Sequence, residues 1–202
     1  PGRVAAAPPP HVLGDVLVHR ALVHARRLDA IEQVDLHARG GDDSFTVYGA
    51  PTDGVTNLFG DQGSDHFAVQ NANIAGSLNL IGGLGDHNAF SFQATADADQ
   101  IDLDAQSLSV TDGALVQFQE ISLLTLNTLG GNDEVSVSDS ILGSTDIHLG
   151  SGEDRLVLHG NSGAATITGG RDNDELIFLG VGAPTEVDAG EGDDSIRGGA
   201  ES

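Results

Sequence analysis

Two segments, twenty residues apart, carry the pattern that decides the fold of this chain. Residues 169–177 are Gly-Gly-Arg-Asp-Asn-Asp-Glu-Leu-Ile, and residues 189–197 are Ala-Gly-Glu-Gly-Asp-Asp-Ser-Ile-Arg. Both have glycine in their first half, aspartate at the sixth position and an apolar residue two positions later. Glycine is needed where φ is positive or where two backbones approach closely, so each segment predicts a tight turn that leads into a strand.

The sixth position of this motif, here called the aspartate slot, recurs along most of the chain. Successive slots are 22, 23, 45, 21, 20 and 20 residues apart, which gives a period of about 21 residues. We interpret the interval of 45 as two periods in which one turn, near residues 108–115, has lost its motif. The slot residues are Asp43, Asp65, Asn88, Asp133, Asp154, Asp174 and Asp194.

Apolar residues keep the same register as the slots. The positions two and four residues after each slot are apolar, with Gly198 as the exception, and so is the position seven residues before it. Such alternation is typical of a strand with one buried face. A unit of this length cannot bury its apolar face alone, so the units must stack. The sequence predicts an all-β, right-handed parallel β-solenoid with coils of about 21 residues.

The sequence also contains a longer repeat, of 90 residues, that spans several of the short units. A shift of 90 residues without gaps aligns the apolar residues of 11–47 with those of 101–137. We therefore divide a single array, residues 11–202, into a module at 11–100 and a related module at 101–202, each beginning with a motif-free coil. Residues 1–10, which contain three consecutive prolines, are expected to be a linker. Residues 21–34 have two interpretations, a coil of the solenoid or an amphipathic capping helix.

Stacking of the coils brings the carboxylates of successive slots close together. Neighbouring coils lie about 4.8 Å apart, so equivalent carboxylates form a column in which two unit charges repel by roughly 3–4 kcal/mol at an effective dielectric constant near 20. Such a column needs cations or protons, and Ca²⁺ accepts 6–8 oxygen ligands in irregular geometry. We predict calcium ligands at the slots and in the glycine turns: Asp43, Asp65, Asp133, Asp154, Asp174, Asp194, Gly152, Gly190 and Gly192.

Composition excludes several partners. The chain has 31 acidic and 8 basic residues and a formal net charge of −23, so it should bind neither nucleic acid nor an anionic membrane. It has no cysteine for disulfides or thiolate sites, and no apolar run approaches the length of a membrane span. Cations are the natural partners of such a chain.

The motif resembles the Gly/Asp-rich nonapeptide of the RTX, or hemolysin-type, calcium-binding repeats, G-G-x-G-x-D-x-U-x with U apolar. The similarity extends over residues 34–198, and it implies secretion, calcium-dependent folding and a place in a large secreted or cell-surface protein. The chain differs in having one nonapeptide per coil, from which we expect one calcium edge rather than two. Some turns also lack the leading glycine pair, as at Ala38-Arg39 and Thr128-Leu129. A one-edged solenoid is similar to the repeats of calcium-dependent ice-binding adhesins.

We therefore expect a calcium-binding structural segment of a larger secreted or surface protein, adhesin-like, that stacks on neighbouring repeats of a longer chain. The alternative is a metal-free solenoid stalk or passenger whose Asp and Asn side chains cap the turns. Less favoured are a polysaccharide-acting β-helix enzyme, since no catalytic motif is present, and an ice-binding module, since no threonine row is present. We expect no enzymatic activity.

Overall fold

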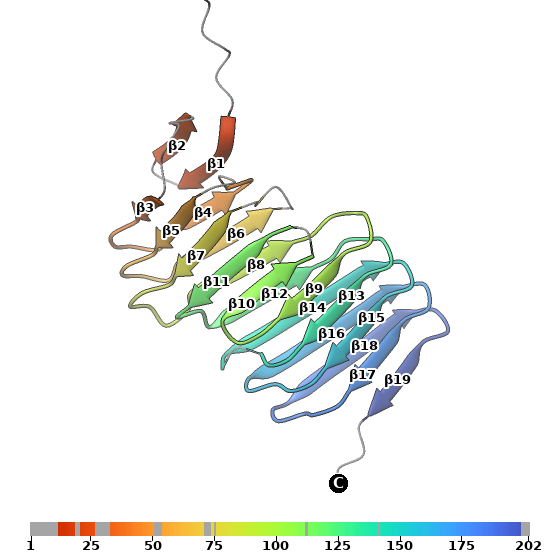
Figure 1. Cartoon of the computed structure of the whole chain (residues 1–202). Helices are drawn as coiled ribbons and strands as arrows, with labels where there is room; N and C mark the ends of the chain where they lie inside the picture. The colour runs from red at the N-terminus through yellow and green to blue at the C-terminus, as the bar shows by residue number, and fades with distance from the viewer. Residues whose placement is uncertain are drawn as a thin grey trace, which may run out of the picture.

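The structure is a computed structural model that describes residues 12–18, 21–26, 33–50, 54–70, 74, 76–111, 113–140 and 142–198. All regular elements in these residues are strands, and they form two sheets (Figure 1). Successive coils of the chain stack on one another, which confirms the predicted parallel β-solenoid. The described residues contain no helix long and apolar enough to cross a membrane. The predicted linker, residues 1–10, lies outside the described residues.

Most successive strands alternate between two sheets, A and B. Sheet A consists, in spatial order, of β18 (Thr185–Glu191), β16 (Ala164–Arg171), β14 (Ser144–Ser151), β12 (Leu123–Asn127), β8 (Ala89–Gln93), β6 (His66–Gln70), β4 (Ser44–Val47), β1 (Val12–Val18) and β2 (Ala21–Arg26). Sheet B consists of β19 (Ser195–Gly198), β17 (Glu175–Phe178), β15 (Arg155–Leu158), β13 (Glu134–Val137), β9 (Gln100–Leu103), β10 (Ser107–Val110), β11 (Leu115–Gln119), β7 (Ser77–Ile81), β5 (Val55–Phe59) and β3 (Gln33–His37).

The core lies between the two sheets and is built from the alternating positions of the motif. Phe45, Val47, Val135 and Val137 are fully buried, which confirms the predicted inward positions two and four residues after the slot. Phe45 stacks on its counterpart Phe67 with ring centroids 5.0 Å apart. Each such side chain contributes roughly 1.5–3 kcal/mol by burial, and only stacked coils supply the cover.

One inward position differs from the prediction. The turn before Asn88 has an additional residue, so Leu80 rather than Ile81 points into the core. Ile81 instead lies on the outer face of sheet B and is half-buried. A shift of one residue in a strand moves a side chain to the opposite face.

The interval of 45 residues is not two parallel coils. After β9, the chain reverses into β10, which is antiparallel to both β9 and β11, and β11 then pairs in parallel with β7. Sheet B thereby gains a meander, whereas in sheet A β12 pairs directly with β8. The prediction that a turn near residues 108–115 had only lost its motif is wrong, because this segment forms antiparallel strands.

The meander is accompanied by a change of edge. Before it, the motif turns lead from sheet B to sheet A, as between β3 and β4; after it, they lead from sheet A to sheet B, as between β12 and β13. Because β4, β6, β8, β12 and β14 run parallel in sheet A, the turns that lead into this sheet and the turns that lead out of it lie at opposite edges (Figure 1). The motifs thus form two columns rather than the single edge expected from the sequence.

The proposed 90-residue modules agree with the strand bounds in part. β3 and β4 correspond residue for residue to β12 and β13, although the paired elements lie in opposite sheets. The motif-free first coil of the N-terminal module is instead an antiparallel hairpin, β1–β2, in which β1 is also antiparallel to β4. A capping helix at residues 21–34 is excluded for residues 21–26, which form β2, while residues 27–32 lie outside the described residues.

Candidate metal centre

The motif turns share one backbone conformation, which explains their glycines. Two positions have positive φ, four and two residues before the slot, as at Gly150 (φ 101°) and Gly152 (φ 125°). Gly190 (φ 97°) and Gly192 (φ 152°) occupy the same two positions in the last turn. The turns without the glycine pair keep this geometry, because Leu129 adopts φ 71°. Turn shape is therefore retained where the sequence departs from the motif, at a cost of about 1–2 kcal/mol per left-handed residue.

Close stacking of the turns is the second reason for glycine. The carbonyl oxygen of Gly131 points at the following turn so closely that a Cβ on Gly152 would overlap it. The carbonyl of Gly41 faces Gly63 in the same way at the other edge. Successive turns therefore place backbone carbonyl oxygens between the coils, where a cation could find oxygen ligands.

The slot side chains form a hydrogen-bonded ladder between coils. Each carboxylate or amide Oδ1 accepts a hydrogen bond from the backbone N–H of the slot residue in the preceding coil, at 2.8–2.9 Å. The donor and acceptor pairs are Asp43 and Asp65, Asp65 and Asn88, Asp99 and Asp133, Asp133 and Asp154, Asp154 and Asp174, and Asp174 and Asp194. Every slot aspartate that has a coil before it in its ladder is thus also a cap on that coil.

The ladder places the predicted residues in two columns. Asp43 and Asp65 stand with Asn88 at one edge, and the remaining predicted aspartates stand at the other. Asn88 ends its column, since its Nδ2 donates to the carbonyl of Glu120 at 3.1 Å. A neutral amide thus fills this slot, whereas the other predicted slots hold carboxylates.

Asp99 is a slot residue that the sequence analysis missed. Its N–H donates to Asp133 Oδ1, 34 residues further on, and its Oδ2 accepts hydrogen bonds from Thr95. The turn before it has no glycine, so this segment does not match the Gly/Asp motif. The signal that could have found it is the apolar pair Ile101 and Leu103, at the usual two and four residues after the slot.

The second oxygen of four slot aspartates has no partner. Oδ2 of Asp65, Asp133, Asp154 and Asp174 is buried and makes no hydrogen bond in the described residues. The four residues are only 1–2% exposed. In the turn of Asp174, a Cβ on Gly169 would lie 2.6 Å from this oxygen, so the carboxylate lies directly against the beginning of the turn. A buried oxygen without a partner indicates a missing proton or cation.

Electrostatics supports this conclusion. Burial raises the pKa of these four carboxyls, and for Asp154 it raises the pKa from 3.8 to about 7. The backbone hydrogen bond from Asp133 opposes the shift at Asp154, and the charges of Asp133 and Asp174 add to it. Near neutral pH, ionisation of the buried carboxyls in the column therefore costs free energy, and the ladder hydrogen bonds do not fully offset this cost.

The residues fit a calcium ion in ligand type. Carboxylate and carbonyl oxygens are the ligands that Ca²⁺ prefers, and both kinds are present between the coils. The described residues contain no group of three or more His, Asp or Glu side chains arranged around one point, so the turn carbonyls would have to complete each site. The predicted glycines Gly152, Gly190 and Gly192 could contribute only through their backbone.

Comparison of the chain with protein-family models, with curated proteins and with solved structures finds no match.

Proposed function

We propose that this chain is a calcium-binding structural segment of a larger secreted or cell-surface protein, related to the RTX repeats and serving adhesion. The solenoid would extend or stiffen the parent protein, and calcium ions along the motif edges would hold its coils together. No catalytic role is proposed.

One observation carries the proposal. Four aspartates that are 1–2% exposed each leave one carboxylate oxygen without a partner among the described residues, in columns where the next slot stands one coil away. Buried charge of one sign is costly unless an opposite charge compensates it. A divalent cation supplies that charge and accepts the free oxygen as a ligand.

The glycine turns would provide the remaining ligands. Carbonyl oxygens at Gly131 and at its counterparts lie between successive turns, so a cation there would bind the coil on either side. Such a bond would join units that otherwise contact only their neighbours, which explains how the ion would govern folding.

A metal-free solenoid is the second candidate, and one observation favours it. Each Oδ1 in the ladder already accepts a backbone N–H, so the aspartates act as caps without any ion. In that case the buried carboxyls would be neutral, with a proton on Oδ2. The two candidates differ in what compensates the charge, Ca²⁺ or a proton.

Thermal unfolding followed by circular dichroism at pH 8 separates them. We expect millimolar calcium to raise the melting temperature over that in chelator, because a ligand at 100 times its dissociation constant adds about 2.7 kcal/mol per site. Magnesium at the same concentration is the control, since it demands near-octahedral geometry and dehydrates reluctantly. Equal melting temperatures in calcium, magnesium and chelator would leave the metal-free solenoid.

A further inference from the structure

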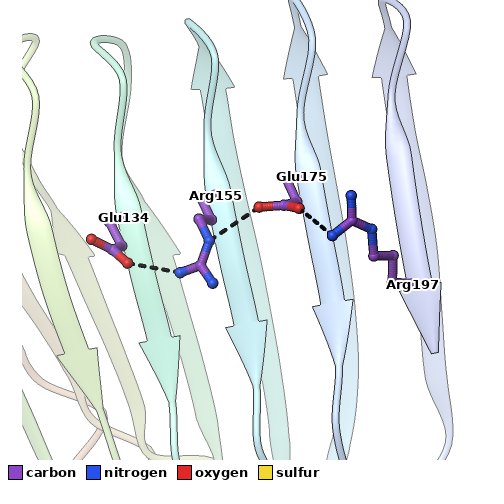
Figure 2. A network of polar contacts seen from close by, with 4 residues as sticks. All are labelled: Glu134, Arg155, Glu175 and Arg197. Atoms are coloured by element: carbon purple, nitrogen blue, oxygen red, sulfur yellow. Dashed lines mark hydrogen bonds and ion pairs between the residues drawn. The ribbon is translucent and has the colours of Figure 1, made fainter. Parts of the chain in front are cut away.

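The outer face of sheet B carries two different surfaces. Over β13, β15, β17 and β19, Figure 2 shows a chain of ion pairs that joins Glu134, Arg155, Glu175 and Arg197. The charged atoms lie 2.7, 3.1 and 3.0 Å apart along this chain. These four charged side chains of the face therefore pair with one another.

Over β5, β7 and β11 the same face is uncharged and hollow. A depression of about 440 Å³ lies here, within the size range of small-ligand sites. Its lining contains no ionisable residue, although the chain has 31 acids. The lining is instead rich in amides, with Asn57, Asn79, Gln106, Gln117 and Gln119.

The side chains of Asn57, Asn79 and Gln117 form a row across neighbouring strands, and the end of this row has hydrogen-bonding groups without partners in the described residues. Asn57 Nδ2 donates to Asp35 at 2.6 Å, and Asn79 Nδ2 donates to Asn57 Oδ1 at 2.6 Å. Asn79 Oδ1 is buried and has no partner in the described residues. Gln117 follows Asn79 in the row and is exposed, and its side chain makes no hydrogen bond with the described residues. The hollow therefore offers the free amide of Gln117, which both donates and accepts, next to an Asn79 oxygen that is itself buried.

An apolar row runs beside the amides. Phe59 and Ile81 are neighbours across β5 and β7, and both are half-buried on the outer face. Phe59 is held by a stacked contact with His37, with ring centroids 4.2 Å apart. Ile81 faces outward because of the additional residue in its turn. The hollow thus combines a rigid apolar platform with uncharged hydrogen-bonding groups.

We propose that this hollow binds a neutral carbohydrate. A hexose ring has an apolar C–H face, which suits Phe59 and Ile81, and a rim of hydroxyls that donate and accept, which suits the exposed amide of Gln117. The absence of charge in the lining fits a neutral sugar. The proposal deepens the adhesive role by naming a ligand class, and it does not depend on calcium.

Other ligands fit less well. A peptide that binds by strand addition needs a free sheet edge, whereas β5, β7 and β11 each pair with strands on both sides. Nucleic acids and anionic glycans would be repelled by a chain of net charge −23.

The test is an NMR titration of the side-chain amide signals of the full chain with maltohexaose, cellohexaose, laminarihexaose and mannohexaose, each up to about 10 mM, a range that detects dissociation constants near 1 mM. We expect at least one of them to shift the signals of Asn79 and Gln117. Gln117→Ala and Phe59→Leu should each weaken that binding about three- to tenfold, the range of a lost hydrogen bond or ring contact. Glu175→Gln, on the charged half of the same face, is the matched control and should bind as the wild type does.

Circular dichroism of the same samples, with and without calcium, separates this test from the calcium proposal. If a sample with the spectrum of the folded solenoid shows no shift with any of the four sugars, the carbohydrate site is refuted and Gln117 serves only to extend the amide row. Equal affinity in the wild type, Gln117→Ala and Phe59→Leu would refute it as well. Shifts produced by a heparin oligosaccharide or an extended peptide, but by none of the sugars, would assign the hollow to that other class.

Discussion

Replacing Asp154 by asparagine tests how the buried column is compensated. Asp154 lies in the middle of its column, between Asp133 and Asp174, and is 2% exposed. Its Oδ1 accepts the Asp133 N–H at 2.8 Å, and its Oδ2 has no partner in the part of the chain that the structure describes. Asparagine keeps the acceptor and removes the charge, as Asn88 does at the other edge. The substitution removes the charge and replaces the second oxygen with an NH2 donor, which at Asn88 is satisfied by the carbonyl of Glu120.

Without metal, Asp154→Asn should stabilise the protein at pH 8. Burial raises the pKa of Asp154 from 3.8 to about 7, so the folded state holds the proton more tightly than the unfolded state does. Stability is then lost as the pH rises from about 4 to 7, and at pH 8 the full cost of the buried charge is present. A shift of about three units corresponds to at most about 4 kcal/mol, which the neutral variant avoids.

With calcium, the sign should reverse. The variant loses a charged ligand from a site shared by two coils, so millimolar calcium should stabilise it less than the wild type, by several kcal/mol. Urea unfolding of both proteins at pH 8, in chelator and in calcium, measures all four free energies. Glu153→Gln removes an exposed charge next to the slot and serves as control. If Asp154→Asn destabilises the protein in chelator and leaves the calcium increment unchanged, the argument from uncompensated buried charge is refuted.

Three further predictions use the same geometry. In chelator, the urea concentration at the unfolding midpoint should decrease as the pH is raised from 5 to 8, because burial raises the pKa of four slot carboxyls, which then lose their protons inside the folded protein. An increase of this concentration with pH would contradict the view that these carboxyls are buried without a compensating charge. Gly152→Ala should cost about 2 kcal/mol more than Gly41→Ala in urea unfolding, because both have positive φ but only the first would overlap a neighbouring carbonyl; equal losses would show that the turns can separate freely. Calorimetric titration should show that Asp154→Ala lowers calcium affinity more than Asp194→Ala does, because Asp194 is only partly buried and lies in the last described coil. Equal losses of affinity would mean that each aspartate acts singly as a cap of its turn.

Much of the fold could be predicted because its rules are local. Alternation after each slot correctly identified Phe45, Val47, Val135 and Val137 as core residues, since a strand with one buried face shows it in its own sequence. Positive φ at the turn glycines is likewise a property of a few adjacent residues. The candidate site shares this advantage, because each predicted aspartate is fixed within its own turn and stacking then aligns it with the next.

The sequence by itself therefore determined the solenoid, its period, the inward faces and the aspartates that stack. Only the tertiary structure decided to which edge each aspartate belongs. Asn88 and Asp99 are 11 residues apart, about half a coil, so the motif passes from one edge to the other between them. Inward residues alternate identically in both sheets, so the pattern cannot say which sheet a strand joins. Pairing of β10 with β9 and β11 is a contact between distant backbone groups, and no residue pattern within a single strand encodes it.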